Sequence, residues 1–328
     1  MSITDRIDRF QQRHPAVGFP LAVFYKFFDD QGGYLAALIA YFGFISLFPL
    51  LLLFSTVLGI VLVGNPELQQ RIIDSAMSQI PLIGEQLGQP DKLSGGSSAI
   101  VIGILGSLYG GLGVAVAAQN AMNVAWSVPK NERPDPIRAR VRGLGLLVTV
   151  GTAVIGVTVL NGFNAAGFFG TIAQVFVTIA AIVLNTATFV VAFRLGTPRA
   201  VTVKQVLPGA LIAALLWQAL QTFGGYYVQS VVGGADTTNG VFAIVLGLLA
   251  FLYVASIVLV LCIEVNVVRA DRLHPRSLLT PFTDNVELTD GDRDAYTAAA
   301  EAQKSKGFEE IDVTFGEPGG EPVADPAR

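Results

Sequence analysis

Long runs without a charged residue divide the chain into apolar segments. Uncharged runs of 36, 37, 51, 31 and 27 residues follow Asp30, Lys92, Arg142, Lys204 and Asp236. A hydrocarbon core about 30 Å thick needs about 20 apolar helical residues to cross it. Four runs suit one crossing each, whereas the 51-residue run suits two helices joined by a short turn. The pattern therefore predicts an all-α membrane protein with six transmembrane helices.

The predicted transmembrane domain covers residues 31–275. Its six spans are expected at about 33–62, 98–118, 143–161, 171–193, 206–228 and 241–266. A large soluble helical protein is the alternative, but its surface helices would each need a polar face. Leu144–Leu160 and Ile172–Phe193 are apolar on all sides, which favours the membrane.

The segments outside the spans have a different character. Residues 1–30 mix basic and aromatic residues, with Phe24, Phe27 and Phe28 on one helical face. Such a helix beside a span tends to lie in the membrane interface, so about 19–30 is predicted to be an interfacial elbow helix. The segment 66–92 has helical periodicity and predicts a short amphipathic helix pair. From 276 to 328 the chain is acidic and rich in Gly and Pro, which predicts a disordered cytoplasmic tail.

Basic residues predict the orientation of the helices. Lys and Arg accumulate in cytoplasmic loops. Fifteen of them lie in the segments before span 1, between spans 2 and 3, between spans 4 and 5, and directly after span 6; Arg71 and Lys92 alone lie in the opposite loops. This predicts a multi-pass protein of a bacterial cytoplasmic (inner) membrane with both termini in the cytoplasm. The basic surface is expected to contact anionic lipid head groups rather than nucleic acid.

Two features inside the spans concern helix shape and packing. Pro49 removes a backbone donor within span 1 and predicts a kink there. Gly106 and Gly110 form a GxxxG pair in span 2, which lets another helix approach closely. Packing within the chain is favoured over dimerisation, although a homo-oligomer stays open.

Polar residues inside apolar spans are the candidates for a ligand-binding or transport pathway, because such groups must find a partner or line water. The candidates are Tyr41, Ser46, Gln119, Asn123, Asn185, Gln218 and Glu264. For the amides, hydrogen bonding between helices is the favoured alternative. Glu264 is the single acidic residue within a predicted span. It either pairs with Arg269 or a loop arginine, or acts as a proton-coupling or head-group-binding carboxylate.

Enzyme chemistry has little support in the sequence. The two histidines, His14 and His274, lie at opposite ends of the chain, and Cys262 is the single cysteine. A metal-dependent nuclease needs clustered His, Asp or Glu ligands. The Gly-rich segments also lack the Lys-Ser/Thr of a phosphate-binding loop. We expect no catalytic residues, no metal and no cofactor.

Four ordered segments resemble a known family. They are Gly32–Leu53, Ala118–Pro129, Pro208–Leu220 and Asn239–Asn266. Together they are similar to the BrkB/YihY family of bacterial inner-membrane proteins, over about residues 20–275. The resemblance implies six spans and a role in the cell envelope; some members are linked to virulence, and the family's former ribonuclease label is regarded as mistaken.

Three functions remain in competition at this level. A transporter or translocase of lipid, envelope-related or other small substrates is favoured by the spread of polar residues over several spans. A structural membrane protein that binds an envelope partner is the alternative. A membrane enzyme is the third and lacks a motif.

Overall fold

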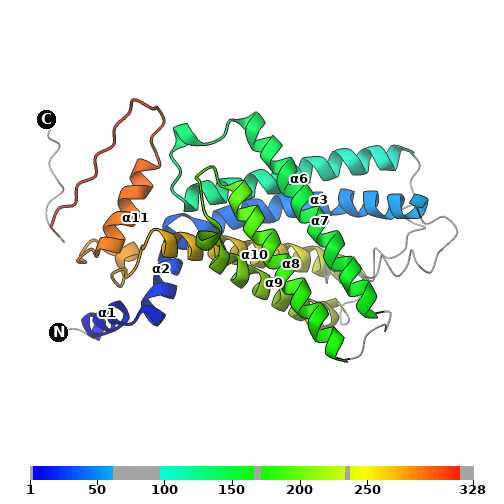
Figure 1. Cartoon of the computed structure of the whole chain (residues 1–328), viewed down its shortest axis with the longest axis horizontal. Helices are drawn as coiled ribbons and strands as arrows, with labels where there is room; N and C mark the ends of the chain where they lie inside the picture. Colours follow the sequence, from blue (N-terminus) through cyan, green and yellow to red (C-terminus); the bar gives the residue numbers. More distant parts are fainter. Residues whose placement is uncertain (1–2, 62–96, 166–170, 233–236, 318–328) are drawn as a thin grey trace.

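The computed structural model describes residues 3–61, 97–165, 171–232 and 237–317 (Figure 1). Long helices occupy all six predicted ranges: α3 (Gly32–Val61), α6 (Ser97–Ala125), α7 (Pro136–Ala165), α8 (Thr171–Gly196), α9 (Val203–Val232) and α10 (Thr237–Ala270). The described residues contain no strand. The prediction of an all-α fold is therefore confirmed.

Four of these helices contain stretches long and apolar enough to cross a membrane. The stretches are Val101–Ala125, Val175–Gly196, Val203–Gln221 and Val245–Ala270. In α3 the corresponding stretch, Gly32–Leu47, is shorter. The six expected ranges are helical, but the number of membrane crossings remains a prediction.

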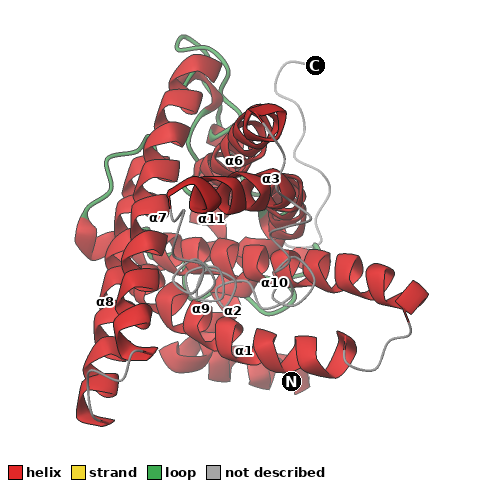
Figure 2. Ribbon diagram, turned by 90° about the vertical axis from the view of Figure 1, so that its right-hand side faces the viewer, coloured by secondary structure: helices red, strands yellow, loops and turns green. Residues whose placement is uncertain are grey.

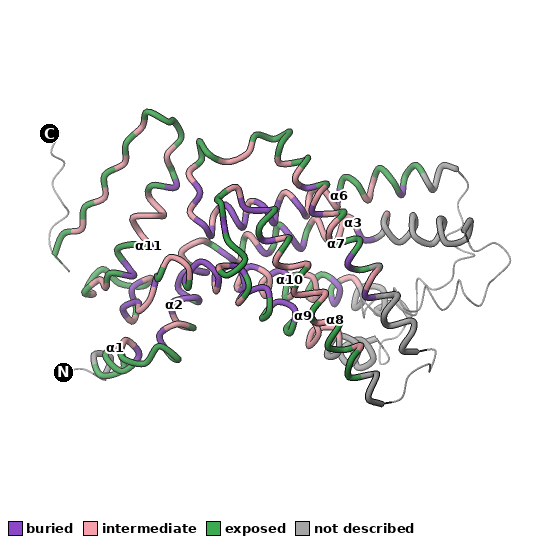
Figure 3. The backbone as a smooth tube through the Cα atoms, viewed as in Figure 1, coloured by how far each residue is buried: buried purple, intermediate pink, exposed green. Residues whose placement is uncertain are grey.

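In Figure 1, α3 and α6 lie along the long axis of the molecule, whereas α7 and α8 run obliquely to it. The most extensive packing joins α3 to α6, α10 packs on α9 and α3, and α8 packs on α7 and α9. Small buried residues such as Ala121, Ala210 and Ala214 lie between helices, whereas Leu105 and Val148 are more than 60% exposed (Figure 3). Small residues inside and large apolar residues outside are typical of helices that pack in lipid.

The glycine face of α6 explains the close approach of α3. A Cβ on Gly106 would lie 2.7 Å from Cβ and Cγ of Pro49. A Cβ on Gly110 would lie 2.5 Å from Cβ of Ser46. Both glycines therefore pack within the chain. Because α3 continues through Pro49 as one helix, the predicted kink at this residue stays a prediction.

Short elements gather at one end of the bundle, which we call the α2 end (Figures 1 and 2). They are α1 (Ile3–Arg13), α2 (Pro15–Asp29), the 3-10 turns Lys130–Glu132 and Thr280–Phe282, and α11 (Asp290–Glu301). A helix is thus present where the interfacial elbow was expected, and its location at a membrane surface stays a prediction.

The prediction of a disordered tail is wrong for residues 276–301, whereas residues 302–317 contain no helix or strand and disorder there stays a prediction. Arg276 and Asp292 are both 0% exposed, and α11 begins with a capping box at Thr289. The acidic composition was misleading, because acidic residues in the first helical turn and a buried ion pair both stabilise this segment. Residues 318–328 and the predicted helix pair at 66–92 lie outside the described residues.

Candidate functional site: a buried charge cluster beneath α2

Glu264 is completely buried in the apolar helix α10. Its exposure is 0%, and its helix neighbours Val260, Ile263 and Val268 are also at most 1% exposed. No hydrogen-bond donor of the described residues reaches either carboxylate oxygen. A buried charged group is costly unless it is paired, so this side chain needs a compensating neighbour.

The neighbours of Glu264 come from the end of α2. Lys26 lies in the last turn of α2 and Asp30 caps it, with the Asp30 N–H donating to the Lys26 carbonyl. Gln31 then adopts a left-handed φ of 54°, which ends the helix and turns the chain into α3. Lys26 and Asp30 form an ion pair, and their side chains are only 2% and 6% exposed. The i,i+4 spacing brings the two groups to one face.

Lys26, Asp30 and Glu264 act on one another electrostatically, and we call them the carboxyl–lysine cluster. Burial lowers the pKa of Lys26, but the attraction of Glu264, Asp30 and Asp29 outweighs it, so the net shift is upward. Burial raises the pKa of the Asp30 carboxyl, and Lys26 opposes this only in part. The ammonium of Lys26 is thus stabilised in its charged form by the neighbouring carboxyl groups.

The expected pairing of Glu264 with Arg269 is wrong. Arg269 is exposed, and within the described residues no ion pair joins it to Glu264. Five positions along a helix separate two side chains by about 140° around the axis, so one faces the core when the other faces out. The cation beside Glu264 belongs to α2 instead.

A second buried network adjoins the first and contains Asp29, Arg276 and Asp292. Arg276 donates from Nη2 to Asp29 at 3.0 Å and from Nε to Asp292. Burial lowers the pKa of Arg276, but Asp292 and Asp29 outweigh it, so the net shift is upward. Asp292 also accepts from Ser277 N–H at 2.8 Å and from Thr289 Oγ at 2.8 Å. We call this set the Arg276 network.

Further hydrogen bonds fasten the segment after α10 to the N-terminal helices. Gln11 donates to the Arg276 carbonyl at 2.6 Å, and the Leu278 N–H donates to Asp8 at 2.8 Å. The Leu279 N–H donates to the Tyr25 hydroxyl at 3.0 Å. The segment after α10 is therefore bound to both α1 and α2.

The predicted amide pair on α6 joins helices. Gln119 donates from its amide to the carbonyls of Ala115 at 3.2 Å and Ala139 at 3.0 Å, and so links α6 to α7. Asn123 is one turn further on and is 7% exposed. The side-chain oxygens of both residues are buried without a donor in the described part of the chain. The hydrogen bonds of Gln119 fit the structural alternative better than a ligand site.

The other candidates do not gather around Glu264. Tyr41 is 56% exposed and stacks edge-on against Phe42. Ser46 donates to the Gly43 carbonyl within α3 at 2.9 Å. Asn185 is half-buried on α8, which packs mainly on α7 and α9 rather than on α10. Gln218 is half-buried on α9. No single pathway through all seven candidates is visible in the described residues.

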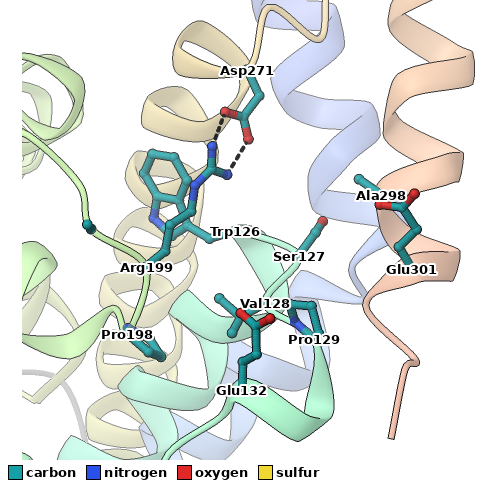
Figure 4. A pocket seen from close by; sticks show the side chains of 11 residues that line it. Trp126, Ser127, Val128, Pro129, Glu132, Pro198, Arg199, Asp271, Ala298 and Glu301 are labelled. Carbon is teal, nitrogen blue, oxygen red and sulfur yellow. Dashed lines mark hydrogen bonds and ion pairs between the residues drawn. The ribbon is translucent and has the colours of Figure 1, made fainter. Parts of the chain in front are cut away.

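An open cavity of about 580 Å³ lies at the α2 end (Figure 4). Its lining includes Trp126, Glu132, Arg199, Asp271 and Glu301. Arg199 binds both carboxylate oxygens of Asp271 at 2.8 Å, and its guanidinium lies 5.1 Å from the centre of the Trp126 ring. Because this ion pair is partly exposed, it contributes little stability, typically about 0–1 kcal/mol.

Comparison with known proteins places the chain in a family. The family model described as Virulence factor BrkB matches residues 23–285. The chain belongs to the BrkB family. No curated protein and no solved structure matches it. With its apolar helices, it is a BrkB-family membrane protein.

The BrkB match contains the whole carboxyl–lysine cluster and Arg276, whereas Asp292, all of α1 and the first half of α2 lie outside it. Sequence reasoning identified Glu264 but missed Lys26, Asp30 and Arg276. The i,i+4 spacing of Lys26 and Asp30, directly before an apolar span, was an available signal for the ion pair. Nothing in the local sequence around Arg276 indicated its burial.

Proposed function

We propose that this BrkB-family protein is a transporter or translocase of the bacterial cytoplasmic membrane, acting on lipid, envelope-related or other small substrates. The observation that carries the proposal is the fully buried Glu264 in α10, whose carboxylate lacks a hydrogen-bond donor. Ionisable residues within membrane helices are costly and characteristically mark pathways for substrates, ions or protons.

The surroundings of Glu264 favour an ion-binding role over a purely structural role. A structural carboxylate would be expected to accept hydrogen bonds at both oxygens. Instead, one ammonium, from Lys26, serves two carboxyls, of Asp30 and Glu264. The cluster is then one positive charge short, and binding a coupling ion such as a proton would neutralise it.

The proposed topology has six crossings with the α2 end in the cytoplasm. The connections that carry Lys130 and Arg199, the start of α7 with Arg138, and the N-terminal helices all lie at that end (Figure 1). Basic residues at one end of the bundle follow the cytoplasmic excess of Lys and Arg. In this orientation α2 lies where the first span enters the membrane.

Reconstitution tests the transport proposal. The full chain in proteoliposomes is expected to carry fluorescent phospholipid between leaflets, read by dithionite quenching, or to exchange small solutes. Glu264→Gln is expected to reduce the rate to that of protein-free vesicles, and Asn185→Leu to lower it, at equal protein content. Full activity of both variants would remove the two residues from the pathway; Glu287→Gln, at an exposed position, is the control.

Partner binding is the second candidate function. Apolar side chains at the α2 end are exposed: Ile7 at 51%, Phe10 at 54% and Phe308 at 92%. Such residues suit a protein partner of the envelope. A chain truncated after Ala302 keeps α11 and lacks Phe308. A stoichiometric partner that copurifies with the full chain but not with the truncated chain would favour this function. We also propose that the protein has no ribonuclease activity, which a metal-supplemented assay of the purified chain would test.

A further inference from the structure

The hydrogen bonding of the carboxyl–lysine cluster is incomplete in a specific way. Asp30 receives the Lys26 ammonium, whereas both oxygens of Glu264 lack a donor among the described residues. The nearest carboxyl that acts on Glu264 is that of Asp30, and both groups interact with the Lys26 ammonium. Two ionised carboxylates are both acceptors, so a hydrogen bond between them requires one bound proton.

The charges of the cluster lead to the same conclusion. Lys26 supplies one positive charge, while Asp30 and Glu264 supply two negative charges when both are ionised. Like-charged carboxyls that share a buried site do not both ionise readily. One bound proton makes the three groups neutral and gives Glu264 the hydrogen bond that it lacks.

Other charged groups nearby supply no second cation to the cluster, and the charge of Asp29 raises the pKa of the Asp30 carboxyl further. The helices α3 and α6 contain no charged residue, and on α9 the single one is the exposed Lys204. On α10 itself Arg269 faces out. Asp29 is already bound by Arg276, which also binds Asp292. Lys26 is therefore the cation that Glu264 and Asp30 share.

We propose that the carboxyls of Glu264 and Asp30 together bind one proton, with Lys26 as their fixed counter-charge, and that this proton is the coupling ion of transport. The proton enters from water and returns to it, and no covalent bond of the protein changes. Asp29, next in sequence to Asp30, is 16% exposed. A metal cation does not suit the site, because the Lys26 ammonium already occupies the place beside the carboxyls.

Infrared spectroscopy of the full chain in lipid nanodiscs tests the proposal without measuring transport. A protonated buried carboxyl gives its own carbonyl band, which shifts in deuterated water. We expect the wild type to show one such band that disappears as the pH is raised. Both Glu264→Gln and Asp30→Asn are expected to lose it, because either substitution leaves one carboxylate to pair with Lys26. The control Asp284→Asn, at an exposed position, is expected to keep it.

Three results would overturn the proton site: no titrating band in the wild type, the full band in either Glu264→Gln or Asp30→Asn, or loss of the band when sodium chloride replaces choline chloride at constant pH. The last result would identify a sodium site.

Each substitution leaves a neutral ion pair with Lys26, so both variants are expected to fold. The titration of the wild-type band tests the proposal even if a variant does not fold. The coupling role rests on the proposed transport function. An intact band in a protein inactive in proteoliposomes would refute transport alone, whereas active transport without the band would refute the proton site alone.

Discussion

Arg276 binds Asp29 across 247 positions of the chain, at 3.0 Å from Nη2 to Oδ2. The guanidinium is 0% exposed and also binds Asp292, the residue that completes the capping box of α11. One buried side chain thus connects the end of α2, the segment after α10 and the start of α11. This connection holds the end of α2, where Asp30 directly follows Asp29 and Lys26 lies three residues before Asp29.

Replacing Arg276 with Met tests that connection. The substitution leaves Asp29 and Asp292 without their cation, and breaking a buried ion pair by removing one partner typically costs about 3–5 kcal/mol. We expect a markedly lower midpoint of thermal unfolding in detergent and faster proteolysis of the segment after α10. Arg293→Met, at an exposed position of α11, is the matched control. Equal midpoints for the two variants would show that the network carries little stability.

The packing of α3 on α6 gives a second prediction. Gly110→Ala places a methyl group 2.5–2.7 Å from atoms of Ser46, and overpacking of this kind costs about 1–3 kcal/mol. Gly151→Ala, on α7, meets nothing within 4 Å and also replaces a helical glycine. Unfolding in mixed micelles should therefore show destabilisation by Gly110→Ala and none by Gly151→Ala. A Gly110→Ala protein as stable as wild type would mean that these helices are further apart.

Stability should depend on pH through Asp30. Burial raises the pKa of this carboxyl above its ordinary value of 3.8, so the folded protein holds the proton more tightly than the unfolded chain does. The resulting stabilisation is complete below pH 3.8 and is lost as the pH rises through the folded-state pKa. The unfolding midpoint of the wild type relative to Asp30→Asn should thus fall as the pH is raised from 3.8 through the folded-state pKa. A difference that grows over this range would contradict the shift.

Topology can be read by cysteine labelling. In a Cys262→Ser background, a cysteine at Asn131, in the exposed loop between α6 and α7, should react with an impermeant maleimide only after the cells are opened. A cysteine at Gly64, between α3 and α6, should react in intact cells. Labelling of both positions in intact cells would contradict six crossings with the α2 end in the cytoplasm.

The helices were predictable from sequence, because long uncharged runs such as Arg142–Arg194 reflect a local requirement of the membrane. The arrangement of charges was not. Glu264 stood out as an acid among apolar residues, but its partner lies 238 positions earlier, and only packing of α2 on α10 brings Lys26 to it. The prediction that the acidic segment containing Asp292 is disordered failed for a related reason. Composition measures average solvation, whereas one buried arginine binds this segment to the end of α2.

The initial rate of fluorescent phospholipid translocation, measured with and without a transmembrane pH gradient, tests the role of Glu264 most directly. Wild-type proteoliposomes should translocate faster when the gradient is imposed, while Glu264→Gln proteoliposomes should remain at the protein-free rate under both conditions. A Glu264→Gln protein that translocates as fast as the wild type and responds equally to the gradient would contradict a coupling role for this residue.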